Sequence, residues 1–222
     1  MSSNVTYKYI KQNPDIMEYI RRADRALEAQ GYTEHSFAHV EIVAQNASLI
    51  LTELGYDERQ IELAKIAGIM HDIGNVVNRH DHAISGATMA FRILDNMGMD
   101  PSDVAAVITA IGHHDDSTAF PVNAIAAALI LADKTDVRRS RVRNKDMSTF
   151  DIHDRVNYSV ERSEVLLDVE SKTITLSLSI NTEMCAVMDY FEIFLQRMLL
   201  CRRAAEQLGL SFRLEINGQL LL

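Results

Sequence analysis

Residues 66–75 read IAGIMHDIGN and place His71 and Asp72 side by side after an apolar stretch. The apolar residues recur at helical spacing, so we expect a helix that begins at Asp57 and ends at Gly74. Neighbouring side chains on a helix point about 100° apart, so this pair cannot grip one ion symmetrically. The aspartate can instead bridge two metal ions while the histidine binds one of them. The segment therefore predicts a helical fold with a metal centre in its interior.

Other histidines and an aspartate recur in similar apolar surroundings. Seven of the eight histidines lie between positions 35 and 114. His35 and His39 are four residues apart, which would place them on one face of a helix that we expect Thr33 to cap. Asp133 follows a very apolar helical stretch, and an unpaired carboxylate there would cost several kcal/mol, roughly, so a metal ion or a hydrogen-bonding partner is expected.

Each of these residues also has a structural interpretation. A lone His39 could be a hydrogen-bonded core histidine, and His71 with Asp72 could be a cation and counter-ion at a helix end. Asp133 could pair with Lys134 or Arg138. Because four separate helices each deliver such a residue, we favour one shared site.

The last third of the sequence predicts a small sheet with one helix. Residues 173–180 alternate between apolar and polar side chains, which indicates a half-buried strand, and residues 165–169 would pair with it as a hairpin. A long apolar helix over 183–208 and an alternating segment at 212–216 follow, and then the favoured hairpin turn Asn217-Gly218. We therefore predict a mainly α fold, a helical bundle followed by a small α+β C-terminal unit with an antiparallel sheet.

Composition excludes several classes of protein. The 222 residues are 47% hydrophobic and 24% charged with a net charge of -9, which is typical of a soluble globular protein and opposes stable nucleic-acid or membrane binding. Residues 1–9 lack the apolar core of a secretory signal, and no apolar run approaches the ~18 residues of a membrane span. Cys185 and Cys201 lie in an apolar helical stretch, which indicates buried thiols in a reducing compartment. We expect a cytoplasmic protein.

An ordered series of motifs between about residues 33 and 142 resembles the HD-domain superfamily of metal-dependent phosphohydrolases. The series consists of His39, HDIGN at His71 and Asp72, HAISGA at His82, the pair His113 and His114, and LADK at Asp133. The resemblance implies an all-helical fold with a mononuclear or binuclear metal centre. The change of sequence pattern near residue 150 separates residues 1–150, the HD-type metal-binding helical domain, from residues 151–222, a small α+β domain for which we expect a dimerisation or lid role.

The resemblance also implies roles for single residues. The core metal ligands would be His39, His71, Asp72 and Asp133, and the extra ligands of binuclear members would be His82, His113 and His114. His35 stands where some binuclear members have an additional ligand. Imidazole and carboxylate ligands without thiolate fit one or two divalent transition metal ions, with iron or manganese preferred and zinc, cobalt or nickel allowed. Asp72, His71 and Lys134 would be the catalytic residues.

The implied activity is cleavage of a phosphomonoester or phosphodiester, first of all in a nucleotide, by a metal-activated hydroxide. Arg79 and Arg138 are candidates to bind the phosphate of this small substrate, Arg138 within a helix that we expect to continue through the basic stretch 138–145. HDIGN resembles the HDIGK of the HD-GYP cyclic-di-GMP phosphodiesterases, but Asn75 replaces the lysine and DDSTAFP replaces their glycine-rich segment, which opposes that substrate.

Two other functions stay open on the sequence. Extra histidines also occur in HD-type mixed-valent di-iron oxygenases, and a non-catalytic metal-binding regulatory or scaffold protein is the third alternative. The apolar helix over 183–208 is wider than one packing stripe, so a homodimer through the C-terminal region is also expected.

Overall fold

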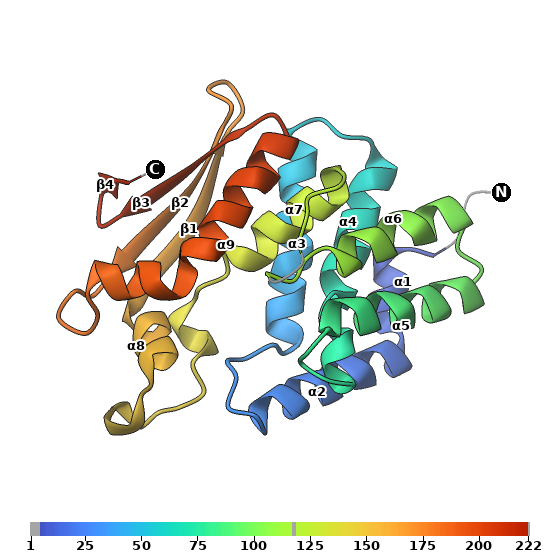
Figure 1. Ribbon diagram of the computed structural model, residues 1–222. Coiled ribbons are helices and arrows are strands. Elements are labelled where there is room, and N and C mark those ends of the chain that lie inside the picture. The colour runs from blue at the N-terminus through green and yellow to red at the C-terminus, as the bar shows by residue number, and fades with distance from the viewer. Residues whose placement is uncertain (1–4, 117–118, 222) are drawn as a thin grey trace.

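The computed structural model describes residues 5–116 and 119–221 (Figure 1). The described residues form nine α-helices: α1 (Tyr7–Gln12), α2 (Pro14–Glu28), α3 (Phe37–Glu53), α4 (Glu58–Met70), α5 (His82–Asn96), α6 (Pro101–Gly112), α7 (Ala124–Lys134), α8 (Ile152–Ser159) and α9 (Val187–Gln207). They also form the short 3-10 helices η1 (Ile73–Val76), η2 (Arg139–Arg141) and η3 (Met147–Thr149) and the strands β1 (Val160–Asp168), β2 (Thr173–Ile180), β3 (Ser211–Ile216) and β4 (Gln219–Leu220). The predicted fold class, mainly α with a small α+β C-terminal unit, is confirmed.

The sheet is mixed, with the strand order β1-β2-β3-β4. β1 and β2 form an antiparallel hairpin, as do β3 and β4, where Asn217 and Gly218 both have the positive φ that a tight hairpin turn requires. β2 and β3 are parallel, because α9 carries the chain back to the end of the sheet at which β2 begins. The prediction of an antiparallel sheet is therefore wrong for this one pair of strands.

α9 lies between the sheet and the helical bundle (Figure 1). It packs against β3 on one side and against α7 on the other. Phe194 of α9, Leu214 of β3 and Leu129 of α7 are all buried in one continuous hydrophobic cluster. This packing brings the C-terminal unit against the helix that carries Asp133. The domain boundary near residue 150 and the homodimer stay predictions.

Three helix boundaries differ from the prediction. α4 ends at Met70 with His71 as its C-cap, so it does not run to Gly74, which lies in the separate 3-10 helix η1. α3 is capped by Ser36, whose hydroxyl accepts a hydrogen bond from the amide of Ala38, so Thr33 is not the cap and His35 precedes the helix. α7 ends at Lys134, and the basic stretch 138–145 contains only the short η2. The expected continuation of the helix into that stretch is therefore wrong.

α8 was not predicted. Its eight residues are too few for a helical period to stand out, and Asp151 caps it by accepting a hydrogen bond from the amide of Asp154 at 2.7 Å. Among the described residues, no helix combines the length and the apolar content needed to cross a bilayer.

Two glycines allow the close backbone approaches that shape the bundle. A Cβ atom at Gly68 would lie 2.5 Å from the Cα of Ala44, so α4 and α3 touch backbone to backbone. A Cβ atom at Gly74 would lie 2.0 Å from the carbonyl oxygen of His82 and 2.4 Å from the amide nitrogen of Gly86. η1 is therefore docked directly on α5, which brings the end of α4 close to His82.

Candidate metal centre

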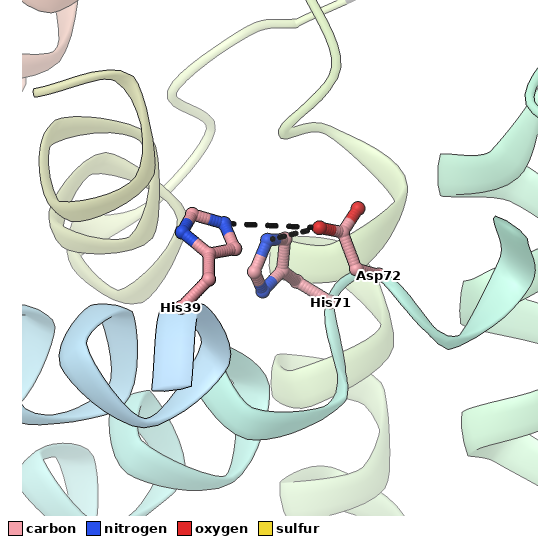
Figure 2. A group of neighbouring side chains, drawn as sticks. All are labelled: His39, His71 and Asp72. Atoms are coloured by element: carbon pink, nitrogen blue, oxygen red, sulfur yellow. Dashed lines mark ion pairs between the residues drawn. The ribbon is translucent and has the colours of Figure 1, made fainter. Parts of the chain in front are cut away.

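Six of the predicted ligands meet in the interior of the bundle, where α3, α4, α5, α6 and α7 converge. They form three overlapping groups whose ligand atoms lie within 4.8 Å of one another: His39, His71 and Asp72; His71, His114 and Asp133; and Asp72, His82 and His114. Figure 2 shows the rings of His39 and His71 directed to the carboxylate of Asp72. Five of the six residues are buried, and Asp133 is half-buried.

The carboxylate of Asp72 faces two sides of the site. Its Oδ2 lies 3.1 Å from Nε2 of His71 and 3.8 Å from Nε2 of His39. Its Oδ1 lies 3.5 Å from Nε2 of His82 and 3.9 Å from Nε2 of His114. Each oxygen therefore serves a different pair of imidazoles, which is the arrangement of a bridging carboxylate.

Asn75 orients this carboxylate. Its side-chain amide donates hydrogen bonds to Oδ1 of Asp72 at 2.8 Å and to the Asp72 carbonyl oxygen at 3.0 Å. Asn75 is buried in η1, one turn after the aspartate. A lysine at this position would replace the neutral donor with a charge, so the asparagine of HDIGN has a defined structural role here.

Every imidazole of the two triads that share Asp72 is oriented by an oxygen acceptor at Nδ1. The Nδ1 contacts are His39 to Asp136 Oδ2 at 2.7 Å, His71 to the Gly68 carbonyl at 2.7 Å, His82 to the Arg79 carbonyl at 3.1 Å and His114 to the Ile111 carbonyl at 2.6 Å. A carbonyl or carboxylate oxygen only accepts, so Nδ1 carries the hydrogen in each ring. Nε2 then presents its lone pair to the shared centre, as a metal-ligating histidine does.

Two of these lone pairs, on the buried Nε2 atoms of His39 and His71, have no hydrogen-bond partner among the described residues. Nε2 of His82 lies 3.2 Å from Nε2 of His114, and two lone pairs at that distance repel each other unless a cation lies between them. Buried polar atoms are almost always satisfied, so the residues present fit a divalent transition metal ion.

The charges of the site also favour a cation. Burial raises the pKa of Asp72, but His71 and its neighbours outweigh burial and hold the pKa well below its usual range. Burial likewise opposes ionisation of Asp133, but Lys134 and His39 hold its pKa low. Burial lowers the pKa of His114 to about 3. The site therefore combines ionised carboxylates with a neutral imidazole.

The balance at His71 points the same way. Burial lowers its pKa, but the carboxylates of Asp72 and Asp133 outweigh burial and raise it. The carboxylates thus attract positive charge to this point, which a bound metal ion would supply.

Asp136 supports the site, although no sequence pattern indicated this role. Besides His39, its carboxylate accepts hydrogen bonds from Nε of Arg138 at 2.5 Å and from the same guanidinium at 3.0 Å, and Arg141 lies 3.7 Å away. Arg138 is thus turned onto Asp136 and does not line the cavity above the site. The predicted phosphate-binding role of Arg138 therefore has no support in its placement. Only proximity in sequence to Asp133 could have indicated Asp136.

A cavity of about 380 Å³ opens onto the site at Asp72, His82, His114 and Asp133. Four cationic side chains line it: Arg79, Lys134, Arg141 and Arg197. α8 contributes the polar side chains of His153, Asp154 and Asn157 to the lining. α9 contributes Phe194 and Arg197. The predicted site residues Arg79 and Lys134 are therefore both placed at the cavity.

Two predicted ligands are not brought into the groups. His113, the C-cap residue of α6, belongs to none of the three triads found among the described residues, and its Nδ1 is buried without a hydrogen-bond partner there. His35 lines the cavity and its ring lies 5.4 Å from that of His39, but it too is absent from the triads of the described part of the chain.

Comparison with known proteins adds the following. A family model described as HD domain matches residues 36–146. An uncharacterized protein of Methanocaldococcus jannaschii is 24% identical over 200 residues, which cover 80% of this chain and 76% of that protein. Ribonuclease Y of Geobacter sulfurreducens is 30% identical over 141 residues, 62% of this chain but only 24% of that enzyme. A crystal structure of a "predicted HD superfamily hydrolase" from an uncultured Thermotogales bacterium has a TM-score of 0.45 and 30% identity, and the match covers 56% of this chain and 67% of that one.

Proposed function

The chain belongs to the HD domain family, whose model matches half of its length, and on that premise we propose that it is a metal-dependent phosphohydrolase. The substrate we propose is a small phosphomonoester or phosphodiester, first of all a nucleotide. The observation that carries the proposal is the placement of Asp72, with one carboxylate oxygen toward each pair of imidazoles, at the floor of a cation-lined cavity.

The ligands divide into two positions that share Asp72. His39 and His71 would hold one divalent ion on the Oδ2 side, together with Asp133, and His82 and His114 would hold a second on the Oδ1 side. Ions bound there supply Lewis-acid polarisation of a phosphoryl oxygen and lower the pKa of water. Iron or manganese is the preferred metal.

Cationic residues around the ligands would stabilise the negative charge of the substrate. Lys134 is buried and its Nζ lies 2.8 Å from Oδ2 of Asp133, so its positive charge is held at the edge of the ligand cluster. Arg79 reaches within 3.4 Å of Nε2 of His82 and is held by Asn75 at the same distance. Both cations would stabilise the negative charge that develops on the phosphoryl oxygens.

The same cations favour a phosphate ester over the substrate of a di-iron oxygenase. Aspartates line the cavity as well, and Arg141 and Lys134 already contact Asp136 and Asp133. Arg79 and Arg197 still have donors for an anion, and an oxygenase acting on a neutral substrate has no need of them. A non-catalytic scaffold has no need of an open cavity above the ligands either.

Size and charge favour a small substrate. The cavity of about 380 Å³ falls in the usual range of small-molecule sites. The similarity to ribonuclease Y supports a phosphoester bond as the target, but the net charge of -9 opposes the binding of a long RNA strand.

A substrate screen tests the proposal. The chain reconstituted with Mn²⁺, Fe²⁺, Co²⁺, Ni²⁺ or Zn²⁺ is incubated with nucleotides, cyclic nucleotides and nitrophenyl phosphates, and released phosphate or nitrophenol is measured. We expect cleavage that requires metal, is lost in Asp72→Ala and is kept in His80→Ala, because His80 is an exposed histidine outside the site. Cleavage that persists after metal removal, or no cleavage with any of the metals, would overturn the proposal.

A further inference from the structure

Arg197 lies outside the segment that matches the HD family, yet its side chain lines the cavity above the ligand cluster. It extends from α9, the helix that packs between the sheet and α7. The C-terminal unit therefore contributes a cation directly to the site. We propose that Arg197 binds the phosphate of the substrate, a role that rests on the proposed phosphohydrolase function.

Arg197 and Lys134 are joined through one carboxylate. Nε of Arg197 contacts Oδ2 of Asp116 at 2.9 Å, and Nζ of Lys134 lies 3.3 Å from Oδ1 of the same residue. The two cations are thus held on the two oxygens of a single side chain. Since Lys134 also contacts Asp133, this chain of contacts runs from α9 to the ligand cluster without a gap.

The guanidinium of Arg197 is held in place but remains accessible. Its Cζ lies 5.0 Å from the ring centre of Phe194, which is fully buried one turn earlier on α9. Its side chain is 33% exposed. A guanidinium carries five N–H donors, and the contact of Nε with Asp116 uses one of them. The terminal nitrogens form the planar fork that matches two oxygens of a phosphate.

Charge balance favours an anion at this point. Arg197 and Lys134 share Asp116, and Asp133 belongs to the proposed ligand set, so its negative charge would serve a bound metal ion. Lys134 and Arg197 then carry more positive charge than Asp116 balances, and a phosphate oxygen can supply the missing negative charge. The other reading is structural: Arg197 would only anchor Asp116 and the loop that follows α6.

The test measures binding of inorganic phosphate to the full chain reconstituted with Mn²⁺, by isothermal titration calorimetry. We expect Arg197→Ala to weaken phosphate binding about tenfold or more, since a hydrogen bond to a charged group is worth at least that. Arg197→Lys keeps the positive charge but lacks the planar pair of terminal nitrogens, so its phosphate affinity should lie between those of the wild type and Arg197→Ala. Arg203→Ala, an exposed arginine on the same helix, is the matched control and should bind as the wild type does.

Asp116→Asn separates the two readings. If Arg197 binds phosphate, removal of the carboxylate charge leaves phosphate binding unchanged or tightens it. If Arg197 acts only by anchoring Asp116, Asp116→Asn weakens binding as much as Arg197→Ala does, and the proposal is wrong. Thermal unfolding of each variant shows whether a loss of phosphate binding is caused by a loss of fold. If Arg197→Ala does not fold, phosphate binding by Arg197→Lys decides between the two readings.

The outcomes also separate this inference from the function on which it rests. Phosphate that binds to the wild type and equally to Arg197→Ala overturns the role of Arg197 alone. Wild-type protein that binds Mn²⁺ but neither binds phosphate nor cleaves any phosphoester overturns the proposed function and this inference with it.

Discussion

His39 donates a hydrogen bond from Nδ1 to the carboxylate of Asp136 at 2.7 Å, and both side chains are buried. Asp136 lies three residues after Asp133, beyond the end of α7. One turn of chain therefore supplies both a predicted metal ligand and the carboxylate that orients another. Such a partner fixes the tautomer of a ligating histidine and increases its basicity.

Asp136→Asn should weaken metal binding while the ligands themselves are unchanged. The asparagine amide is neutral, so His39 loses the negative charge that its Nδ1 contacts. Loss of such a partner typically lowers metal affinity by roughly 10- to 100-fold. Competition with a chromophoric chelator measures the effect. Asp95→Asn, at an exposed position of α5, is the control, and equal metal affinity in the two variants would show that Asp136 does not support the site.

Metal stoichiometry tests the division of the ligands into two positions. Because His82 belongs to one triad only, His82→Ala should reduce the bound metal from two ions to one for each chain. Asp72→Ala removes the shared ligand and should lower the occupancy of both positions, with the helical circular dichroism largely retained. Plasma emission spectrometry after gel filtration gives the counts, with His80→Ala as the matched histidine control. A wild-type content of one ion that His82→Ala leaves unchanged contradicts a second position.

Stability should fall on mild acidification through His114. Burial lowers the pKa of His114 to about 3 from its ordinary value near 6.5. Between these values the unfolded chain binds a proton here that the folded chain does not, so the free energy of unfolding decreases as pH falls from about 6.5. The loss is at most about 1.4 kcal/mol for each pH unit.

Urea unfolding of the chelated protein at pH 7.0 and pH 5.0 measures this loss. His114→Gln cannot take up the proton, so the difference in unfolding free energy between the two pH values should be smaller in this variant than in the wild type. Equal differences in the two proteins would show that His114 titrates normally in the folded state.

Gly74→Ala should destabilise the fold and disturb the site together. The new methyl group would meet backbone atoms of His82 and Gly86, which cannot turn away as a flexible side chain could. Overpacking of this kind costs about 1–3 kcal/mol, and more where backbone must move. Gly112→Ala is the matched control, since its Cβ would lie 3.7 Å from the nearest atom and alanine favours a helix. Thermal unfolding compares the two, and equal melting temperatures would contradict the close docking of η1 on α5.

The sequence indicated the ligand cluster because the cluster depends on local patterns. His71, Asp72 and Asp133 each end an apolar helical run, so their side chains had to enter the interior. Asp136 was assigned no role because it follows the helix and carries no periodic signal. Arg138 was expected to face the cleft because the helix was expected to continue, whereas the structure turns its side chain onto Asp136. His113 was grouped with His114 as a ligand, but only His114 belongs to the triads of the described residues.

The parts that the sequence did not predict depend on packing between distant segments. Arg197 comes near Lys134 only because α9 packs on α7, and no pattern around either residue announces that contact. The parallel pairing of β2 with β3 likewise follows from the path of α9 across the sheet. α8 is short, and its role as a wall of the cavity is visible only in three dimensions.

The two oxygens of Asp72 fix the distance between the two sides of the site. Helices in a bundle shift against one another as a protein warms or as its surface loops diverge, and a spacing that depended on their packing would drift with them. The span between the Oδ2 and Oδ1 sides is instead set by the covalent width of one carboxyl group, which no helix movement can stretch.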